Sequence, residues 1–230
     1  MRPDILTALQ TARTDKRPVA LVTNLRSGAQ KLIYRDGTEG ELCIDVDMIM
    51  AAQEMLARDE SGTLQTGAGP IFVHVHNPPP RLIVVGAVHI AEPLVRIGAM
   101  AGFGVSLIDP RRAFAASQSF DGLTVSTAWP DEAMADMKPD VRSAIVTLTH
   151  DPKIDDPALE AALASPAFYI GALGSRKTHA ARLSRLKERG FDDAALARIK
   201  GPVGLDIGAL SPAEIAVSIV AQIVQTRRNP

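Results

Sequence analysis

RLIVVGAVHIAEPLVRIGAMAGFGVSLID, residues 81–109, has the pattern of a buried β-strand, a helix and a second β-strand. Its first apolar run is continuous rather than alternating, which is typical of a strand covered on both faces. The pattern continues to the C-terminus, through the apolar runs LTVST, SAIVTLT and AFYIGAL and the helical stretches DEAMADM and DPALEAALA. Strands that alternate with helices indicate a parallel sheet with helices on both faces, so we expect a Rossmann-like α/β fold.

A proline run, Pro78 to Pro80, predicts a domain boundary, because proline continues neither a helix nor a central strand. Before it, PVALVTNL and QKLIYRDG suggest paired strands with a turn signal at Asp36–Gly37. DVDMIMAAQEMLARD suggests a helix and GPIFVHVHN another strand. The sequence therefore predicts a small α+β N-terminal domain at residues 1–79 and a Rossmann-like C-terminal domain at residues 80–230.

The composition is that of an ordinary soluble globular protein. Among 230 residues, 46% are hydrophobic and 22% charged, and the net charge is -1, which argues against a basic nucleic-acid binder. No apolar run approaches the roughly 18 residues that span a bilayer. The first ten residues lack the pattern of a signal peptide. One cysteine, Cys43, excludes an intrachain disulfide framework and a multi-cysteine zinc site. We therefore expect a cytoplasmic protein without a nucleic-acid or membrane partner.

The turn after the first strand of the sheet, GAVHIA, comes close to the dinucleotide-binding pattern G-x-G-x-x-G/A. Gly86 and Ala91 fit the outer positions, but Val88 occupies the middle one, where a glycine lets the backbone approach a pyrophosphate. Asp109 follows at the spacing of a ribose-binding acid. The pattern favours this fold without ordinary NAD binding, and an NAD(P)-dependent oxidoreductase remains the alternative.

A glycine-rich turn, YIGALGSRKT, predicts an anion site. Gly171 and Gly174 would let N–H groups turn inward, Ser175 would cap a helix with its positive dipole end toward the ligand, and Arg176, Lys177 and Thr178 would add donors. The neighbouring Arg111 and Arg112 would add positive charge. A Walker-type hydrolase is disfavoured, because Arg176 replaces the final glycine of that motif. That alternative predicts magnesium-dependent phosphate release that is lost in Lys177→Ala.

Other polar residues are less specific. His150 and Asp151 follow a predicted strand, and His89 lies in the first turn. His74 and His76 alternate on one strand face and could share a metal, although a surface face is the simpler interpretation. Along the last basic helix we interpret four side chains as a solvated face: Arg182, Arg185, Lys187 and Arg189. At the C-terminus, Ser211, Pro212 and Glu214 predict a capping box and a helix.

Three segments together resemble a known family. They are the 81–109 stretch, YIGALGSRKTHAARLSRL and GPVGLDIGALSPAEIAVSIVAQIV, of which the last two are the most specific. They are similar to the XdhC/CoxI family of xanthine dehydrogenase accessory proteins. The resemblance runs from about Arg81 to the C-terminus, and more weakly through residues 1–79.

The resemblance implies a maturation factor rather than a turnover enzyme. Such proteins bind molybdopterin cofactor, protect it, support its sulfuration and deliver it to molybdenum hydroxylases of the xanthine dehydrogenase type. The implied partners are the apo-hydroxylase and a cysteine desulfurase. A homodimer through the apolar C-terminal helix is a further expectation, although a buried core helix explains that apolar face equally well.

The resemblance also implies ligand-binding positions. In the first half of the C-terminal domain these are Gly86, His89, Ala91, Asp109, Arg111, His150 and Asp151. In the second half they are Gly171, Gly174, Ser175, Arg176, Thr178, Gly204, Asp206 and Gly208, with Lys177 added from its place in the loop. The family usually has glycine where this chain has Val88. Its G-G-C-[VL]-E segment is matched only by GELCID, so Cys43 as a contact of the metal is a hypothesis.

Overall fold

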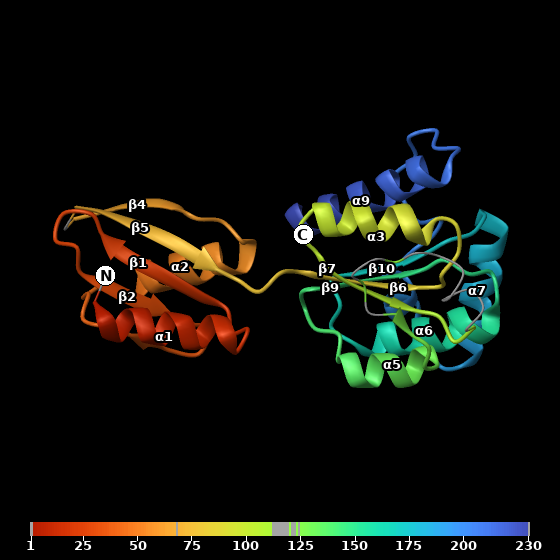
Figure 1. Cartoon of the computed structure of the whole chain (residues 1–230), viewed down its shortest axis with the longest axis horizontal. Coiled ribbons are helices and arrows are strands. Elements are labelled where there is room, and N and C mark those ends of the chain that lie inside the picture. Colours follow the sequence, from red (N-terminus) through yellow and green to blue (C-terminus); the bar gives the residue numbers. More distant parts are fainter. Residues whose placement is uncertain (1, 68, 112–119, 121–122, 124, 230) are drawn as a thin grey trace. The chain divides into compact units, whose positions relative to one another are not determined.

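The chain folds into two compact units, Met1–Pro78 and Pro79–Pro230, so the division falls within the proline run. The structure is a computed structural model, and it describes residues 2–67, 69–111, 120, 123 and 125–229. Figure 1 shows both units, coloured along the sequence. Each unit has its own sheet and its own hydrophobic core.

The first unit is an antiparallel sheet with a helix on each face. Its strands have the order β3-β2-β1-β5-β4. Helix α2 packs on one face through Ala52 and Leu56, and α1 packs on the other through Ile5 and Leu9. The elements are α1 (Pro3–Thr14), β1 (Val19–Asn24), β2 (Gln30–Ile33), β3 (Thr38–Glu39), α2 (Val46–Arg58), β4 (Gly62–Thr66) and β5 (Gly69–His76).

The strands and the helix predicted in this unit are confirmed, and β1 pairs with β2 in antiparallel register. The turn at Asp36–Gly37 joins β2 to β3 rather than β1 to β2. Helix α1 and strand β4 were not predicted. Strand β4 is only partly buried, and α1 buries a narrow stripe, so neither leaves a strong apolar pattern in the sequence.

The second unit is a parallel sheet with the strand order β11-β10-β9-β6-β7-β8. This is the order of a doubly wound fold, in which the chain starts at the centre, moves to one edge and then returns to build the other half. The Rossmann-like fold predicted from the sequence is confirmed. The strands are β6 (Arg81–Val85), β7 (Gly104–Ile108), β8 (Val125–Ser126), β9 (Ser143–Thr147), β10 (Tyr169–Ala172) and β11 (Ile199–Lys200).

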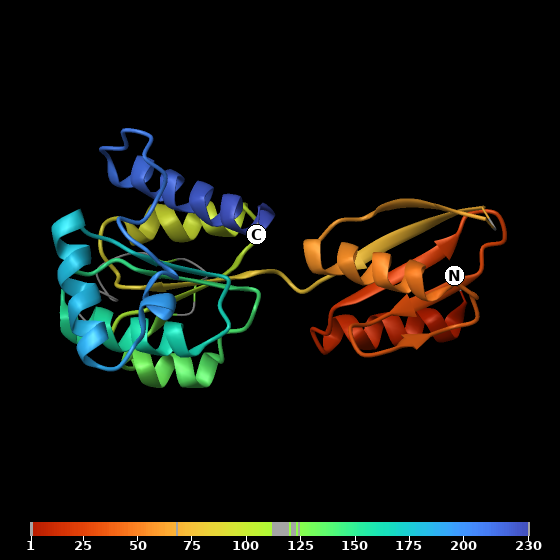
Figure 2. The same ribbon diagram turned by 180° about the vertical axis from the view of Figure 1, so that it is seen from behind.

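Helices cover both faces of this sheet, as Figures 1 and 2 show from opposite sides. Leu82 and Val84 of β6 face α3 and α9, whereas Ile83 and Val85 face the layer of α5, α6, α7 and α8. Both sets are fully buried, which explains the continuous apolar run. The helices are α3 (Ala91–Met100), α5 (Pro130–Met137), α6 (Pro152–Ala164), α7 (Arg176–Glu188), α8 (Asp193–Leu196) and α9 (Pro212–Arg228).

Helix α9 begins as predicted. The Ser211 side chain accepts from the Glu214 N–H, and the Glu214 carboxylate accepts from the Ser211 N–H. The helix buries Ala216, Ile219 and Ile223 in the core beside α3. Core packing therefore accounts for most of its apolar face. Within the described ranges, no helix is both long enough and apolar enough to cross a bilayer.

Candidate functional site

The carboxyl ends of the parallel strands form one edge of the sheet, which we call the carboxyl edge. Helices α3, α6 and α7 begin there, after β6, β9 and β10. The chain reverses its direction of travel across the sheet between β6 and β9, and open α/β sheets bind ligands at such a switch point. Most of the predicted binding residues lie in the turns of this edge.

In the first of these turns, Gly86 lies close to the loop that follows β9. Its φ is +106°, and a Cβ there would lie 2.5 Å from the Thr149 methyl carbon, so the site requires glycine. Val88 is half-buried and packs against the core cluster on the α3 and α9 side. Ala91 begins α3 and is fully buried, while His89 is exposed. The turn therefore presents His89 to solvent.

The Asp109 carboxylate is occupied by its own chain. One oxygen accepts from the Ala87 N–H at 2.7 Å and from the Arg111 guanidinium at 2.8 Å. The other accepts from the N–H and the Nε of Arg111, at 2.9 and 3.0 Å. Burial by itself raises the pKa of Asp109, but these donors hold it below its ordinary value. Four donors use the acceptor capacity of a carboxylate, so this conformation leaves none for a ribose.

The start of α7 combines a capped helix end with exposed cations. The Ser175 hydroxyl accepts from the Thr178 N–H at 3.1 Å, as predicted, and Arg176 and Lys177 are exposed. The first turns of α3 and α6 contain Glu92 and Asp155, whereas the first turn of α7 contains no acid. The positive end of the α7 dipole is therefore not offset locally, which favours an anion.

The two glycines before α7 differ in role. Gly174 has φ +142°, a conformation that favours glycine, and precedes the capping residue. Gly171 does not lie in the turn. It belongs to β10, and its missing side chain makes room for Val203 and for the Tyr169 ring. The interpretation of Gly171 as a residue that opens the loop is therefore wrong.

Asp151 caps α6, since its carboxylate accepts from the Lys153 N–H at 3.0 Å. His150 beside it is exposed. Gly204 packs on α9: its N–H donates to the Gln222 side chain at 2.9 Å, and a Cβ would lie 2.3 Å from the Ser218 hydroxyl. Asp206 and Gly208 are exposed in the segment before α9.

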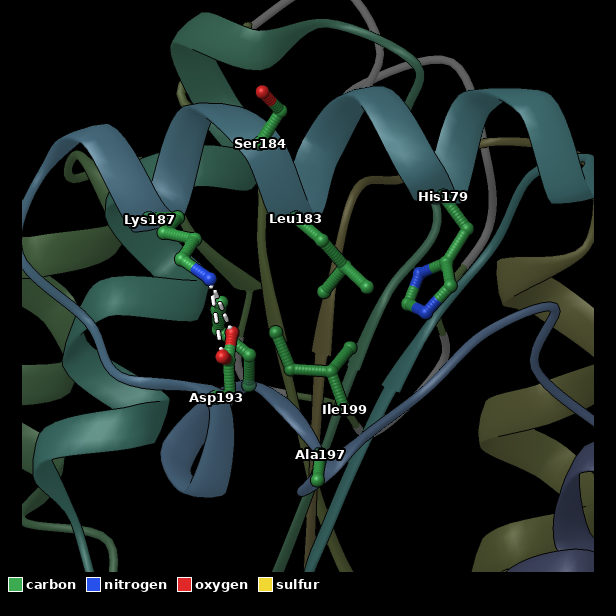
Figure 3. A pocket seen from close by; sticks show the side chains of 8 residues that line it. His179, Leu183, Ser184, Lys187, Asp193, Ala197 and Ile199 are labelled. Carbon is green, nitrogen blue, oxygen red and sulfur yellow. Dashed lines mark hydrogen bonds and ion pairs between the residues drawn. The ribbon is translucent and has the colours of Figure 1, made fainter.

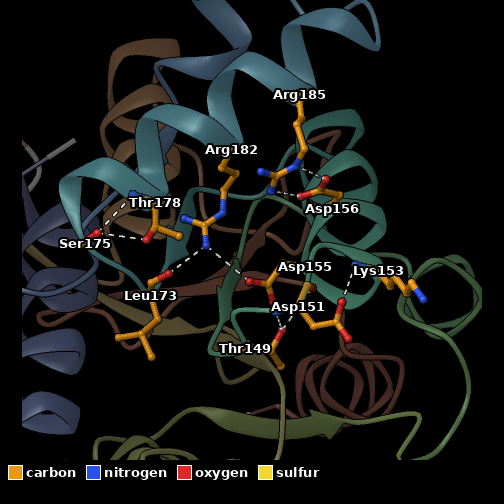
Figure 4. A network of polar contacts seen from close by, with 10 residues as sticks. All are labelled: Thr149, Asp151, Lys153, Asp155, Asp156, Leu173, Ser175, Thr178, Arg182 and Arg185. Atoms are coloured by element: carbon orange, nitrogen blue, oxygen red, sulfur yellow. Dashed lines mark hydrogen bonds and ion pairs between the residues drawn. The ribbon is translucent and has the colours of Figure 1, made fainter.

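A buried network lies below the start of α7 (Figure 4). The Arg182 guanidinium donates to the Leu173 carbonyl at 2.8 Å and lies 3.4 Å from the Asp155 carboxylate. Asp155 also accepts from the Thr149 hydroxyl at 2.5 Å. Arg182 and Asp155 are each only 2% exposed. The interpretation of Arg182 as part of a solvated face is wrong, because α6 covers it.

Arg185 is also paired with an acid of α6. It forms two hydrogen bonds with the fully buried Asp156, at 2.8 and 2.9 Å, and Arg189 lies 3.7 Å from the same carboxylate. Lys187 differs from these arginines, because it is mostly exposed and pairs with Asp193, which is also exposed. Sequence reasoning missed Asp155 and Asp156. Two adjacent acids in an otherwise apolar helix were a usable signal, because such acids need buried partners.

Several buried polar atoms of this layer lack a hydrogen-bond partner among the described residues. They are the Thr147 hydroxyl, Nδ1 of His179, and Nε and one terminal nitrogen of Arg182. Burial raises the pKa of Asp155 to about 6, against the opposing effects of Thr149 and Arg182. Unpaired buried groups are uncommon and cluster where water or a ligand completes the structure.

In the N-terminal unit, Cys43 is exposed and its thiol lies 3.7 Å from the Glu41 carbonyl. His74 and His76 lie on one face with ring centroids 4.1 Å apart. Among the residues the structure describes, no three His, Cys, Asp or Glu side chains gather as a metal site. Arg112, predicted to add charge near Arg111, lies outside the described residues.

The fold and this edge define a class: a Rossmann-type domain whose carboxyl edge has a basic helix start and a first turn altered from the dinucleotide pattern. Comparison with known proteins identifies the family. The family model described as the XdhC Rossmann domain matches residues 82–223. The chain therefore belongs to the XdhC family, as its motifs suggested.

Three curated relatives are similar in sequence. Uncharacterized protein YqeB of Escherichia coli is 32% identical over 176 residues, which are 74% of this chain and 32% of the relative. A probable xanthine dehydrogenase subunit of Bacillus subtilis is 35% identical over 160 residues, 69% of this chain and 46% of the relative. The molybdenum cofactor insertion chaperone PaoD of Escherichia coli is 36% identical over 95 residues, 41% of this chain and 30% of the relative.

A solved structure described as a xanthine dehydrogenase from Bacillus halodurans has a TM-score of 0.74 with 25% identity. The alignment covers 98% of this chain and 64% of that chain. The chain thus spans less than half the length of the curated relatives and about two thirds of the solved chain.

Proposed function

We propose that this protein is a maturation factor that binds molybdenum cofactor and delivers it to a molybdenum hydroxylase of the xanthine dehydrogenase type. The observation that carries the proposal is the start of α7, where a capped helix end without a nearby acid meets Arg176 and Lys177. The phosphate of the cofactor is the anion that this arrangement suits. The names of two relatives point to the same cofactor and the same client class.

In this proposal each part of the carboxyl edge has a role toward the cofactor. The N–H groups at the start of α7 and the side chains of Arg176, Lys177 and Thr178 hold the phosphate. His89, His150 and Asp206 are exposed in the neighbouring turns and contact the rest of the ligand. The cofactor itself supplies the molybdenum and its redox chemistry, which serve the client enzyme rather than this protein.

The remaining expectations complete the proposal. The protein acts in the cytoplasm, without catalytic turnover of its own. It docks on the apo-hydroxylase, receives sulfur for the cofactor from a cysteine desulfurase, and forms a homodimer. Cys43, which is exposed, contacts the metal end of the cofactor. A Cys43→Ser variant that retains cofactor with unchanged affinity would remove this last role.

The saturated carboxylate of Asp109 favours this proposal over an NAD(P)-dependent oxidoreductase. A dinucleotide needs a free acid for its ribose and an open backbone at the second glycine of the turn. Here four donors occupy Asp109, and Val88 stands at the glycine position. We therefore expect neither NADH nor NADPH to bind the first turn.

The test is to purify the protein from a host that makes molybdopterin, denature it, and measure released pterin fluorescence and molybdenum. We expect close to one pterin per chain, and none from a host unable to make molybdopterin. Titration with NADH and NADPH, followed by their fluorescence, is the second arm. A preparation without pterin that binds either nucleotide saturably would replace the proposal with the oxidoreductase.

A further inference from the structure

A second candidate site lies beside α7, on the side away from α6. It is a pocket of about 530 Å³ between α7 and the α8–β11 segment (Figure 3). Its volume falls within the range of small-molecule sites. The lining that matters here is His179, Leu183, Lys187, Asp193, Leu196 and Ile199. None of these residues belongs to the anion site described above.

The end of the pocket nearest the carboxyl edge is formed by a histidine held in place by a glycine. The His179 ring lies against Gly201, where a Cβ would be 2.2 Å from Nδ1. That nitrogen is enclosed and lacks a partner among the described residues. Burial, and the charge of Arg182, lower the pKa of His179. The pocket thus begins with a neutral ring fixed in orientation, one turn into α7.

The far end is formed by a charged pair that opens easily. Lys187 donates to both carboxylate oxygens of Asp193, at 2.7 and 3.0 Å. The two side chains are 60% and 80% exposed, so the pair contributes little stability. A ligand that donates two parallel hydrogen bonds can take the place of Lys187 on this carboxylate.

The floor between the two ends is apolar. Leu196 and Ile199 are buried beneath it, and Leu183 projects into the same space from α7. A flat floor of this kind suits the face of a ring, while His179 and Asp193 suit polar groups on its edge. The occupant that this lining favours is a planar heteroaromatic ring with adjacent N–H donors.

We propose that this pocket binds a 2-amino-4-oxopyrimidine ring, the ring that pterin and guanine share. The ring N–H and the exocyclic amino group lie side by side and donate to the two oxygens of Asp193, as a guanidinium does. The inference rests on the proposed function, because it makes the pocket the second half of the cofactor site.

The helix geometry is compatible with one ligand that reaches both sites. His179 lies four residues after Ser175, about 6 Å along the axis, and Lys187 lies about 12 Å further. A phosphate at the start of α7 and a ring on its flank are therefore separated by about the length of a phosphorylated pterin. The ring comes either from the pterin or from the guanine of a dinucleotide form of the cofactor.

The test uses the full chain and three small probes: 6-hydroxymethylpterin and guanosine, which contain this ring, and adenosine, which does not. Binding is followed by calorimetry and by NMR shifts of the residues that line the pocket. We expect the first two to bind and adenosine to bind at least tenfold more weakly. Preference for the pterin or for guanosine identifies the source of the ring. Equal affinity for all three probes, or shifts confined to other residues, would overturn the inference.

Variants separate recognition from folding. Asp193→Asn keeps the shape but loses the second acceptor, so we expect at least tenfold weaker binding of guanosine. Lys187→Met frees Asp193 from its competitor and should strengthen binding two- to fivefold, which a merely structural role would not produce. Glu188→Gln, a neighbouring exposed acid outside the pocket, is the matched control and should change affinity less than twofold.

Ala197→Phe, which fills the pocket, distinguishes the two proposals. If the wild-type chain carries pterin and this variant carries as much, the pocket inference falls and the maturation role stands. If wild type carries no pterin but binds the ring probes in the pocket, the maturation role falls and the ring site stands. Trp129 fluorescence confirms that each variant is folded, since it is the one tryptophan of the chain.

Discussion

Arg176 and Lys177 are exposed at a helix start whose first turn contains no acid. An exposed arginine elsewhere on a surface contributes little to stability. Here the helix dipole, the N–H groups and the guanidinium act on the same small volume, so an anion gains from all three. The energetic value of Arg176 should therefore appear in binding rather than in folding.

Arg176→Ala should weaken binding of the cofactor by about 1.5–3 kcal/mol, the contribution of a hydrogen bond to a charged group. The free energy of unfolding should change little, because the side chain is exposed. The measurement is cofactor affinity by fluorescence quenching, beside a denaturant titration. Arg35→Ala, an exposed arginine of the other unit, is the control. Wild-type affinity in Arg176→Ala would mean that the phosphate binds elsewhere.

At the scale of elements, buried ion pairs hold α6 against α7. Arg182 joins Asp155 of α6 to the Leu173 carbonyl, just before α7, and Thr149 joins the same acid to the loop after β9. Gly86 packs on Thr149, so the first turn belongs to the same assembly. The geometry of the carboxyl edge therefore depends on charges that no exposed surface displays.

This arrangement predicts a pH dependence of stability. Burial raises the pKa of Asp155 to about 6, so the folded protein holds this proton more tightly than the unfolded chain does. The contribution of Asp155 to the free energy of unfolding is therefore greatest near pH 4. It falls as the pH rises to about 6 and then levels off, with a total change of at most about 3 kcal/mol.

Denaturant titrations of wild type and Asp155→Asn between pH 4 and 8 check this prediction. The stability of wild type relative to the variant should decline between pH 4 and 6 and stay constant above. Asp136→Asn, an exposed acid on α5, should run parallel to wild type throughout. A difference between wild type and Asp155→Asn that is the same at every pH would contradict the assignment.

At the scale of the whole molecule, each unit buries its own apolar core, so each should unfold in its own transition. Leu32→Ala removes a fully buried side chain of the first unit and should destabilise that unit by about 2–5 kcal/mol. Trp129 lies in the second unit and reports on it alone. Its fluorescence transition should stay in place while circular dichroism shows an earlier first transition. A matching shift of the Trp129 transition would show that the units unfold together.

The sequence by itself determined the parallel sheet, the capped starts of α7 and α9, and the family. These features depend on local chemistry: continuous apolar runs, capping side chains and short motifs that act within one turn. The same patterns placed Ser175, Arg176 and Lys177 at a helix start after a strand, where the structure has them. They did not reveal α1 or β4, which bury too little apolar surface to leave a pattern.

Only the tertiary structure decided which polar residues are buried and what they contact. Arg182 and Arg185 look like surface residues in a basic helix, yet α6 supplies Asp155 and Asp156 from more than twenty residues earlier. Asp109 looks like a ribose acid, yet Ala87 and Arg111 occupy it. The reason is physical: a charge is buried only where another element provides its partner, and the sequence around one residue does not contain that partner.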